Sequence, residues 1–395
     1  MAYLDHAATT PMFPMAVAAM SELLADPGNP SSLHAAGRRA RRLVEESREK
    51  TARALGARPT EVIFTAGGTE ANNIALKGLA WAQRNADPKR NRLVISSVEH
   101  HAVLDPIQWL VDDDGFEVTW IAAQPDGTIT PDALQAALGE DSTDVALVSV
   151  MLANNEVGTI NDIAALTAVI RGLGINFHTD AVQAPMWLDV NFAELGVCAM
   201  SVSGHKFGGP HGVGALVMSR DCKATPLIHG GGQERDLRSG TLDTPGIVSF
   251  ATALTNAVDN RDEIVARVSA LHADLVARVL EIAPDANFNG STTRRLANNA
   301  HFSFPGALGD SLLMLLDAQG VECSVGSACS AGVPQPSHVL LAMGADADLA
   351  RCTLRFSLGH TSTAADVDAL IAALPSALDR ARRAGVPRAT VGASA

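Results

Sequence analysis

The chain has 395 residues, of which 47% are hydrophobic and 18% are charged, and its formal net charge is −13. This length can bury a substantial core and predicts two domains. Because nucleic acids and anionic membranes are bound through basic patches, the acidic balance argues against both as general partners. A substrate anion would have to be met by local donors, such as helix N-termini and single arginines.

The sequence carries few signals for targeting, disulfides or metals. It opens without a basic segment followed by an apolar stretch, so we expect no secretory signal. No apolar run approaches the roughly 20 residues that a membrane-spanning helix needs. The five cysteines are few, scattered and odd in number, which predicts a reducing, cytoplasmic location and no disulfide framework. No CxxC pair occurs, so we expect no structural zinc site.

Short apolar runs alternate with helical stretches through the first two thirds of the chain. The runs are often continuously apolar, as expected of strands that helices cover on both faces. The alternation predicts an α/β domain with a mostly parallel sheet. The expected strands are residues 61–65, 92–96, 117–121, 145–152, 175–178, 198–202 and 213–218. The expected helices are residues 32–55, 69–84, 131–138 and 162–172.

The pattern changes after residue 246 and predicts a smaller α+β domain. Its expected elements are a single long helix at 247–282, an apolar segment at 300–304, a helix at 310–319, a strand at 353–358 and a helix at 363–383. We therefore place a large α/β domain at residues 15–250. The small domain comprises residues 1–14 and 251–395 and carries a loop of small residues at 326–332.

Lys206 is the most informative of the five lysines. It follows the apolar run 197–202 and lies among glycines and a histidine, in the sequence Ser203-Gly204-His205-Lys206. Desolvation at the end of a buried strand lowers the pKa of a lysine and favours the neutral amine. A neutral lysine amine forms Schiff bases with carbonyl substrates and with pyridoxal phosphate.

Two strand ends carry residues suited to such a cofactor. Gly67-Gly68-Thr69 joins a strand to a helix, where backbone N–H groups can surround a phosphate, although a tight turn with a threonine cap explains it equally well. Asp180 follows another apolar run, at the sheet edge where open α/β proteins bind ligands. An acid there can pair with a pyridinium nitrogen, and the alternative is a helix cap.

Other strand ends offer a histidine and an amide. One of the adjacent His100 and His101 could stack on an aromatic cofactor and move protons, and a structural hydrogen bond is the alternative. Asn155 follows the apolar run 145–152, where its amide could hold a carboxylate or a ring oxygen. A simple turn is the alternative for Asn155.

The cysteines differ in their surroundings. Cys329 lies in a stretch of small residues, where a thiol is accessible enough to act as a nucleophile. Cys323, six residues earlier, is its main rival. Cys198 is expected to be an inert core residue. Cys222 and Cys352 carry no supporting context.

Arg355 lies between apolar neighbours in an expected strand. An arginine in that setting needs an anionic partner. A bidentate contact with a substrate α-carboxylate would supply one, and an internal salt bridge is the alternative.

Taken together, these segments resemble the pyridoxal-phosphate cysteine desulfurases of the iron–sulfur cluster assembly type, within the class V aminotransferase superfamily. The matches run in the family's order over nearly the whole chain. They are YLDHAATTP (3–11), NPSS (29–32), GGTEANN (67–73), EHH (99–101), NNEVG (154–158), HTDAVQ (178–183), SGHKFGGP (203–210), GGGQE (230–234), RSGT (238–241), GSACSAG (326–332) and RFSLG (355–359).

The resemblance implies the pyridoxal-phosphate transferase fold of type I and a role for each matching residue. Lys206 would form the Schiff base, Asp180 would pair with the pyridine nitrogen and Gln183 with the phenolic oxygen. Cys329 would be the nucleophile, with His101 stacked on the ring as a proton carrier. The residues implied to hold the cofactor are Gly68, Thr69, His101, Asn155, Asp180, Gln183, Ser203, His205, Lys206 and, from the partner subunit of a homodimer, Thr241. Those implied to hold the substrate carboxylate are Asn155 and Arg355.

The implied activity converts L-cysteine to L-alanine and leaves the sulfur as a persulfide on Cys329. That sulfur would pass to an acceptor protein, such as an iron–sulfur scaffold, for clusters or other thio-cofactors. The one metal contact considered is transient ligation of a nascent iron–sulfur cluster by Cys329. Alternatives are a selenocysteine lyase or a related transaminase, and, from another class, a non-catalytic scaffold. A transaminase would survive alkylation of Cys329, and a scaffold would purify without yellow colour.

Overall fold

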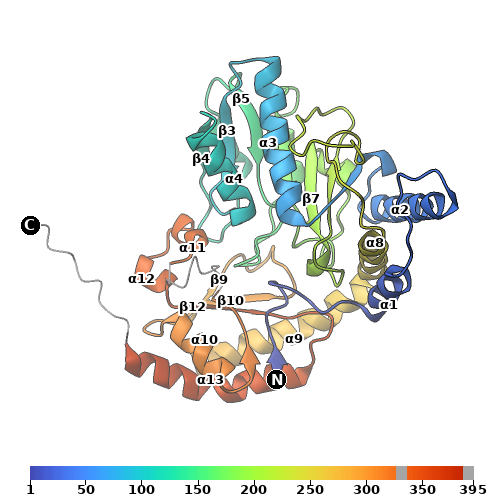
Figure 1. Cartoon of the computed structure of the whole chain (residues 1–395). Coiled ribbons are helices and arrows are strands. Elements are labelled where there is room, and N and C mark those ends of the chain that lie inside the picture. The colour runs from blue at the N-terminus through green and yellow to red at the C-terminus, as the bar shows by residue number, and fades with distance from the viewer. Residues whose placement is uncertain (326–335, 386–395) are drawn as a thin grey trace, which may run out of the picture.

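A computed structural model describes residues 1–325 and 336–385. Its centre is a seven-stranded sheet within those ranges, in the upper half of Figure 1. The strand order is β2 (Val62–Thr65), β8 (Gly214–Met218), β7 (Ala199–Ser203), β6 (Asn176–Asp180), β5 (Val145–Ser149), β3 (Arg92–Ser96) and β4 (Glu117–Ile121). The pairs β7–β6, β6–β5, β5–β3 and β3–β4 are parallel, and β8 is antiparallel to both of its neighbours. The predicted fold class, a mostly parallel sheet between helices, is confirmed.

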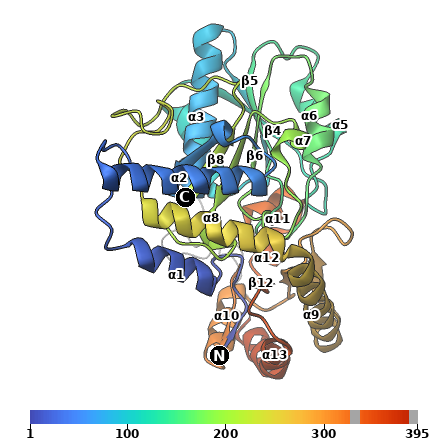
Figure 2. The ribbon, with the colours of Figure 1, turned by 90° about the vertical axis from the view of Figure 1, so that its right-hand side faces the viewer.

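Helices cover both faces of this sheet. Because successive side chains of a strand point to opposite faces, Ile63 packs in one core cluster, and Val62 and Phe64 pack in the other. This explains why the strands read as continuously apolar. The covering helices are α3 (Gly68–Ala86), α4 (His101–Asp112), α5 (Pro131–Leu138), α6 (Ile163–Val169) and α7 (Phe192–Leu195). On another side, α8 (Thr244–Asp259) packs against α1 (Pro14–Leu23) and α2 (Ala35–Ala54), as Figure 2 shows.

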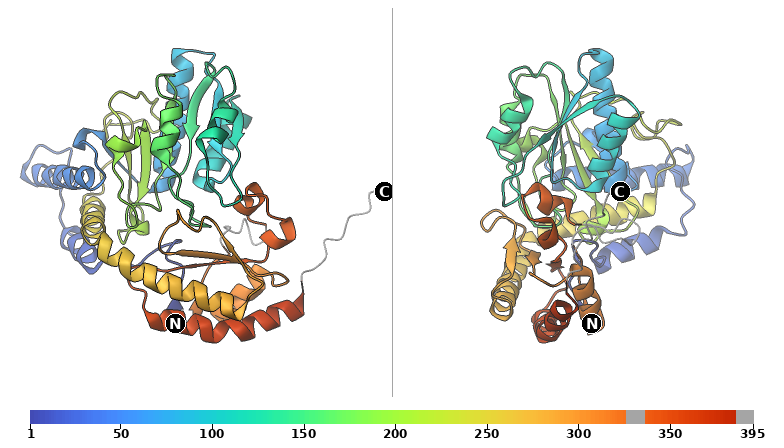
Figure 3. Two further views of the ribbon diagram at one scale, coloured as in Figure 1. Left: turned by 180° about the vertical axis from the view of Figure 1, so that it is seen from behind. Right: turned by 90° about the vertical axis from the view of Figure 1, so that its left-hand side faces the viewer.

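A smaller α+β part lies below the central sheet in Figure 1. Its antiparallel sheet has the order β12 (Thr353–Ser357), β10 (Asn299–Ser303), β9 (Asn287–Asn289). The chain start pairs here in parallel, through β1 (Ala2–Tyr3) and β11 (Val321–Glu322). The helices of this part are α9 (Arg261–Ile282), α10 (Gly309–Asp317), α11 (His338–Ala342), α12 (Ala347–Ala350) and α13 (Ala364–Ala384). Helices α9 and α13 pack side by side along its outer edge (Figure 3).

The expected single helix at 247–282 is wrong. The structure breaks it at Asn260, whose backbone (φ −106°, ψ 11°) leaves the helical region between α8 and α9. The side-chain amide of Asn260 donates to the carbonyl of Asn256, and this local bond competes with continuation of the helix.

Helices α1 and α4 were not expected, and α4 contains Pro106, a residue that usually signals a helix end. The proposed domain boundaries at residues 14 and 250 stay a prediction.

No helix within the two described ranges combines the length and the apolar character that crossing a membrane requires. Within the same ranges, no group of three or more His, Cys, Asp and Glu side chains is arranged to hold a metal ion.

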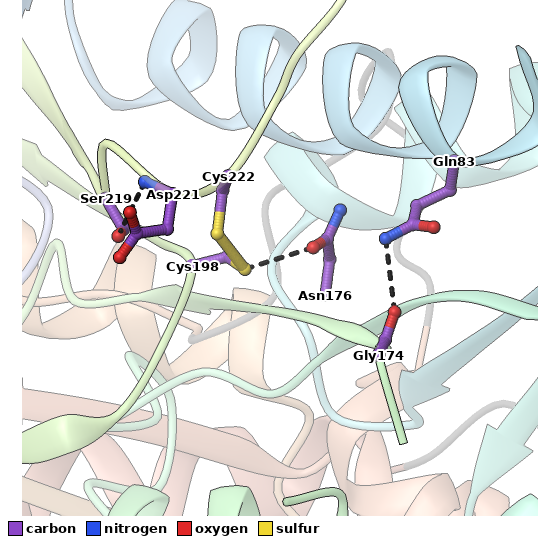
Figure 4. The surroundings of a disulfide bond; sticks show 7 residues. All are labelled: Gln83, Gly174, Asn176, Cys198, Ser219, Asp221 and Cys222. Carbon is purple, nitrogen blue, oxygen red and sulfur yellow. Dashed lines mark hydrogen bonds between the residues drawn. A yellow bond between two sulfur atoms is a disulfide. The ribbon is translucent and has the colours of Figure 1, made fainter. Parts of the chain in front are cut away.

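The expectation of no disulfide is wrong for one pair, shown in Figure 4: the structure joins Cys198 to Cys222. Cys198 directly precedes β7, and Cys222 follows β8, so antiparallel pairing of these strands brings the two cysteines together. Their Cα atoms lie 5.9 Å apart, within the usual range for a disulfide. Cys198 is therefore not an inert core thiol, and Cys222 is its partner.

This bond closes a loop over a sequence separation of 24 residues. We predict that dithiothreitol lowers the free energy of unfolding by roughly 3 kcal/mol, because the open loop gives the unfolded chain more freedom. Guanidinium unfolding of wild-type protein with and without the reductant measures it. The Cys222→Ser variant should have the stability of the reduced wild-type protein both with and without dithiothreitol. Equal stability of the oxidised and reduced wild-type protein would contradict the expectation.

Candidate active site

A cavity opens where strand ends of the central sheet face the small sheet. Its volume is about 400 Å³. Parallel sheets place ligands at the carboxyl ends of their strands, and this cavity lies at the ends of β5, β6 and β7. Residues from the chain start and from β12 complete the wall. The predicted site residues on that wall are Gly68, Thr69, Asn155, Asp180, Gln183, Ser203, His205, Lys206 and Arg355.

Lys206 ends a short 3-10 turn that follows β7. Its Nζ donates to the carbonyl oxygens of Ala7 and Ala8, each at 2.8 Å. Burial, together with the positive charge of Arg355, lowers the pKa of Lys206 to about 8, and the charges of Asp5 and Asp180 oppose this shift. The predicted lowering of this pKa is confirmed. At neutral pH the amine is therefore within reach of its uncharged form.

Asp180 lies at the carboxyl end of β6 and is 5% exposed. Its Oδ2 accepts from Nδ2 of Asn72 at 2.7 Å, and its Oδ1 accepts from the N–H of Val182 at 2.9 Å. Turns rather than a helix follow, so the alternative of a helix cap is wrong for this residue. Gln183 also reaches the cavity, where its Nε2 donates to the carbonyl of Ala7 at 2.9 Å.

The glycine turn before α3 forms a cradle beside the cavity. Gly67 has a φ of +142°, which favours glycine, and α3 begins without a side-chain cap, so the threonine-cap alternative is not what the structure contains. A Cβ added to Gly68 would lie 2.7 Å from Cγ2 of Val182. A 19-residue helix directs its N-terminus into the cavity here. Small residues and a positive helix end suit a phosphate group.

Ser203 and His205 lie beside this cradle. Ser203 ends β7, and its Oγ is the nearest atom to a Cβ built on Gly67. The Nδ1 of His205 is buried and has no partner among the described residues. Burial lowers the pKa of His205 to about 4, with Lys206 adding to the effect, so the ring is neutral at pH 7. An unpaired buried ring nitrogen beside an N-terminal cradle is suited to a ligand contact.

The structure places His100, and not His101, on the cavity wall. His100 is the extended residue before α4, and its Nδ1 accepts from the N–H of Ala102. Desolvation lowers the pKa of His100. His101 begins the helix and turns outward, where its Nδ1 lies 2.9 Å from Asp105 and its side chain is 45% exposed. The choice of His101 as the ring-stacking residue therefore does not fit the geometry, because adjacent residues across a helix start point in different directions.

Arg355 forms the internal salt bridge that the sequence left open as an alternative. It is 4% exposed, it lines the cavity, and its Nη2 also donates to Oδ1 of Asp5 at 2.8 Å. Its Nη1 donates to the carbonyl of Asn155 at 2.8 Å. The Nε atom is buried without a described partner. The internal salt bridge thus exists, and the guanidinium still borders the cavity.

Asp5 and Glu99 were missed by the sequence analysis, although both lie in matched motifs. Glu99 is fully buried behind His100, where its Oε1 accepts from the N–H of Met151 at 2.6 Å and its Oε2 has no described partner. Burial raises the pKa of Glu99 well above its usual value, and nearby Asp180 adds to the rise. The available signal was an acidic residue close behind the apolar strand 92–96.

Cys329 and its loop at 326–332 lie outside the described residues. The chain on either side is held near the cavity. Ser324 lines the cavity and pairs with Arg355 through two backbone bonds, and Ser337 Oγ donates to Oε2 of Glu156 at 2.5 Å. Burial raises the pKa of the rival Cys323 to about 12, which makes it a poor thiolate nucleophile at neutral pH. Thr241 is exposed and is not among the residues that line the cavity.

A buried lysine at a strand end, a phosphate cradle and an acid within one α/β cavity define an aminotransferase-like site. The chain belongs to the class-V aminotransferase family, whose sequence pattern matches residues 2–370. It is 57% identical over 395 residues to an IscS-like cysteine desulfurase of Mycobacterium tuberculosis (strain ATCC 25618 / H37Rv), covering 100% of both chains. It is 43% identical over 381 residues to the cysteine desulfurase IscS of Dictyoglomus turgidum (strain DSM 6724 / Z-1310), covering 96% of this chain and 95% of the relative.

Solved structures show the same likeness. A NifS-like protein superposes with a TM-score of 0.88 at 33% identity, covering 96% of this chain and 100% of that protein. A structure described as SspA in complex with cysteine has a TM-score of 0.79 at 32% identity, covering 92% and 100%. The resemblance inferred from the sequence motifs is confirmed.

We predict that Glu99→Gln stabilises the protein more at pH 8 than at pH 5. The raised pKa means that the folded state holds a proton on Glu99 that the unfolded state releases above about pH 4.5. Stability is therefore lost as the pH rises from there toward the folded pKa, by roughly 1.4 kcal/mol for each pH unit of that interval. Glutamine stays neutral and escapes this loss.

Thermal unfolding of both proteins at the two pH values measures the difference. Glu281→Gln, on the exposed side of α9, serves as the control that removes one carboxylate without burial. A Glu99→Gln effect that is the same at both pH values would show that the carboxyl is charged in the folded state.

Proposed function

We propose that this protein is a cysteine desulfurase, which converts L-cysteine to L-alanine and passes the sulfur to an acceptor. The observation that carries the proposal is the desolvated Lys206 amine in one cavity with Asp180, the Gly68 cradle and Arg355. The relatives support the same activity, since those with the highest identities quoted above are named cysteine desulfurases. A selenocysteine lyase or transaminase is not favoured by these relatives.

The residues of the cavity fit pyridoxal phosphate, the cofactor that the family implies. When bound, pyridoxal phosphate would supply an electron sink for the electron pair released at the substrate Cα. Gly68, Thr69, Ser203 and His205 would hold its phosphate, and a Cβ on Gly68 would clash with Val182 at the cradle. Asp180, fixed by two hydrogen bonds, would keep the ring nitrogen protonated. Gln183 would donate to the phenolic oxygen, with His100 against the ring face.

Lys206 serves as the base as well as the attachment point. Its lowered pKa of about 8 leaves a usable fraction of free amine near neutral pH. The amine then removes the Cα proton of the substrate. The carbonyls of Ala7 and Ala8 orient Nζ, because the amine carries at least two N–H bonds that can donate to them in either protonation state.

Arg355 and Asn155 orient the substrate. The guanidinium is nearly inaccessible to solvent, so its charge-assisted bonds to a carboxylate are strong. The carbonyl of Asn155 fixes one side of the guanidinium, and Asn299 Nδ2 donates to that same carbonyl at 3.1 Å. The side chain of Asn155 is then free to meet the carboxylate.

Cys329 takes the sulfur. Its thiolate bonds to the substrate sulfur while the carbon–sulfur bond breaks, and the released electron pair stays with carbon, which gains protons to become alanine. The product on the enzyme is a Cys329 persulfide. The anchors at Ser324 and Ser337 keep the two ends of its loop near the cavity.

The protein's partners are proposed on the same basis. Thr241 lies exposed in the glycine-rich segment after β8, and we propose that it reaches the phosphate in the second subunit of a homodimer. An iron–sulfur scaffold is the proposed acceptor of the persulfide sulfur. The cytoplasmic location stays a prediction.

The nucleophile and the attachment point are tested together. Mass spectrometry after borohydride reduction should find the pyridoxyl group on Lys206, and after incubation with cysteine it should find one extra sulfur atom on Cys329. Lys206→Ala should abolish turnover. Cys329→Ser should keep the yellow cofactor and lose sulfide release. Normal sulfide release by Cys329→Ser, or the adduct on another lysine, would show the assignment to be wrong.

The two histidines form a matched pair for a second test. We expect His100→Ala to lower kcat by roughly 100-fold, the typical range for a lost proton carrier, and His101→Ala to change it by less than about threefold. Steady-state alanine formation measures both, with bound cofactor quantified by absorbance. A larger loss of kcat in His101→Ala than in His100→Ala would show that His101 is the proton carrier.

A further inference from the structure

Asp5 is an acidic residue beside the cavity whose charge the proposed reaction does not use. It lies between β1 and the cavity-lining Ala7 and Ala8, and its Oδ1 accepts from Nη2 of Arg355 at 2.8 Å. The Asp5 side chain is 22% exposed, and that of Arg355 is 4% exposed. The two residues are 350 positions apart in sequence.

Both members of this pair are held by backbone pairing. Asp5 forms a bridge with Ser357, and the N–H of Ala7 donates to Ser357 Oγ at 2.8 Å. Arg355 lies two residues earlier on the same strand and pairs with Ser324. Asp5 and the Asn155 carbonyl thus hold the two Nη atoms, which fixes the plane of the guanidinium. The N–H bonds not used in these contacts remain for a ligand.

Asp5 also changes the charge that a ligand meets. Lys206 and Arg355 bring two cations to the cavity, and Asp180 is the acidic side chain on its wall. A nearly inaccessible guanidinium without a counter-ion would bind any α-carboxylate tightly. Substrate cysteine and product alanine carry the same α-carboxylate, so such a site would also retain the product.

We propose that Asp5 is a positioning residue that orients Arg355 and weakens its grip on α-carboxylates, so that alanine leaves the site. The inference rests on the proposed role of Arg355 as the carboxylate-binding residue. The negative charge of Asp5 repels a carboxylate bound to the same guanidinium. In a partly solvated site, one charge at this range changes affinity by roughly three- to tenfold.

The test is Asp5→Asn in the holoenzyme. Asparagine keeps the shape and the oxygen that accepts from Arg355 but removes the charge. We expect the dissociation constant of L-alanine, measured by titrating the cofactor absorbance, and the KM for L-cysteine to fall together by roughly three- to tenfold. A merely structural role would leave both constants unchanged, because asparagine keeps the oxygen that accepts from Arg355. Unchanged or raised constants overturn the proposal.

Two further variants separate the possible failures. Glu322→Gln removes a carboxylate from neighbouring β11, which pairs with Tyr3 and is not among the residues that line the cavity, and it should leave both constants unchanged. Arg355→Ala should weaken L-alanine binding by at least about tenfold. If it does not, the proposed role of Arg355 is wrong.

If Arg355→Ala weakens binding and Asp5→Asn has no effect, only the inference about Asp5 is wrong. Adding Asp5→Asn to the Arg355→Ala variant should not tighten its binding of L-alanine, since the charge of Asp5 acts through Arg355. A tightening of similar size in both backgrounds would assign the effect to the general field of the cavity and overturn the proposal. Thermal unfolding of each variant confirms that it is folded.

Discussion

The site depends on the amine of Lys206 being held out of water and bonded by backbone carbonyls from the start of the chain. Ala7 and Ala8 accept from its Nζ, and Ala7 also accepts from Gln183. The first residues of the chain therefore close the cavity over the end of β7. Without that cover the amine would be solvated, its pKa would return toward the ordinary value, and the uncharged fraction at neutral pH would fall.

The same N-terminal segment joins the two parts of the molecule. Its first residues pair with β11 in the smaller part, Asp5 pairs with Arg355, and the following alanines contact Lys206. A shift of the small sheet would consequently be transmitted to the amine of Lys206 through a few residues of extended chain. This connection places Arg355 and Lys206 at a defined separation.

Charge balance inside the cavity differs from that of the whole protein. The chain carries a net charge of −13, yet the cavity is lined by Lys206, Arg355, a helix N-terminus and the neutral imidazole of His205. Burial accounts for much of this. It lowers the pKa of Lys206 and of His205, and it raises the pKa of Glu99, which disfavours a second negative charge close to Asp180.

The sequence by itself determined the strands of the central sheet to within a few residues and the residue types at their ends, because both follow from local apolar runs and turn residues. Lys206, Asp180 and the Gly68 turn were found in that way. The tertiary structure decided which of His100 and His101 faces the cavity, and that Cys198 meets Cys222. It also decided that Asp5 pairs with Arg355. Those outcomes depend on contacts across 24 to 350 positions, or on the rotation of one residue at a helix start, and no local pattern records either.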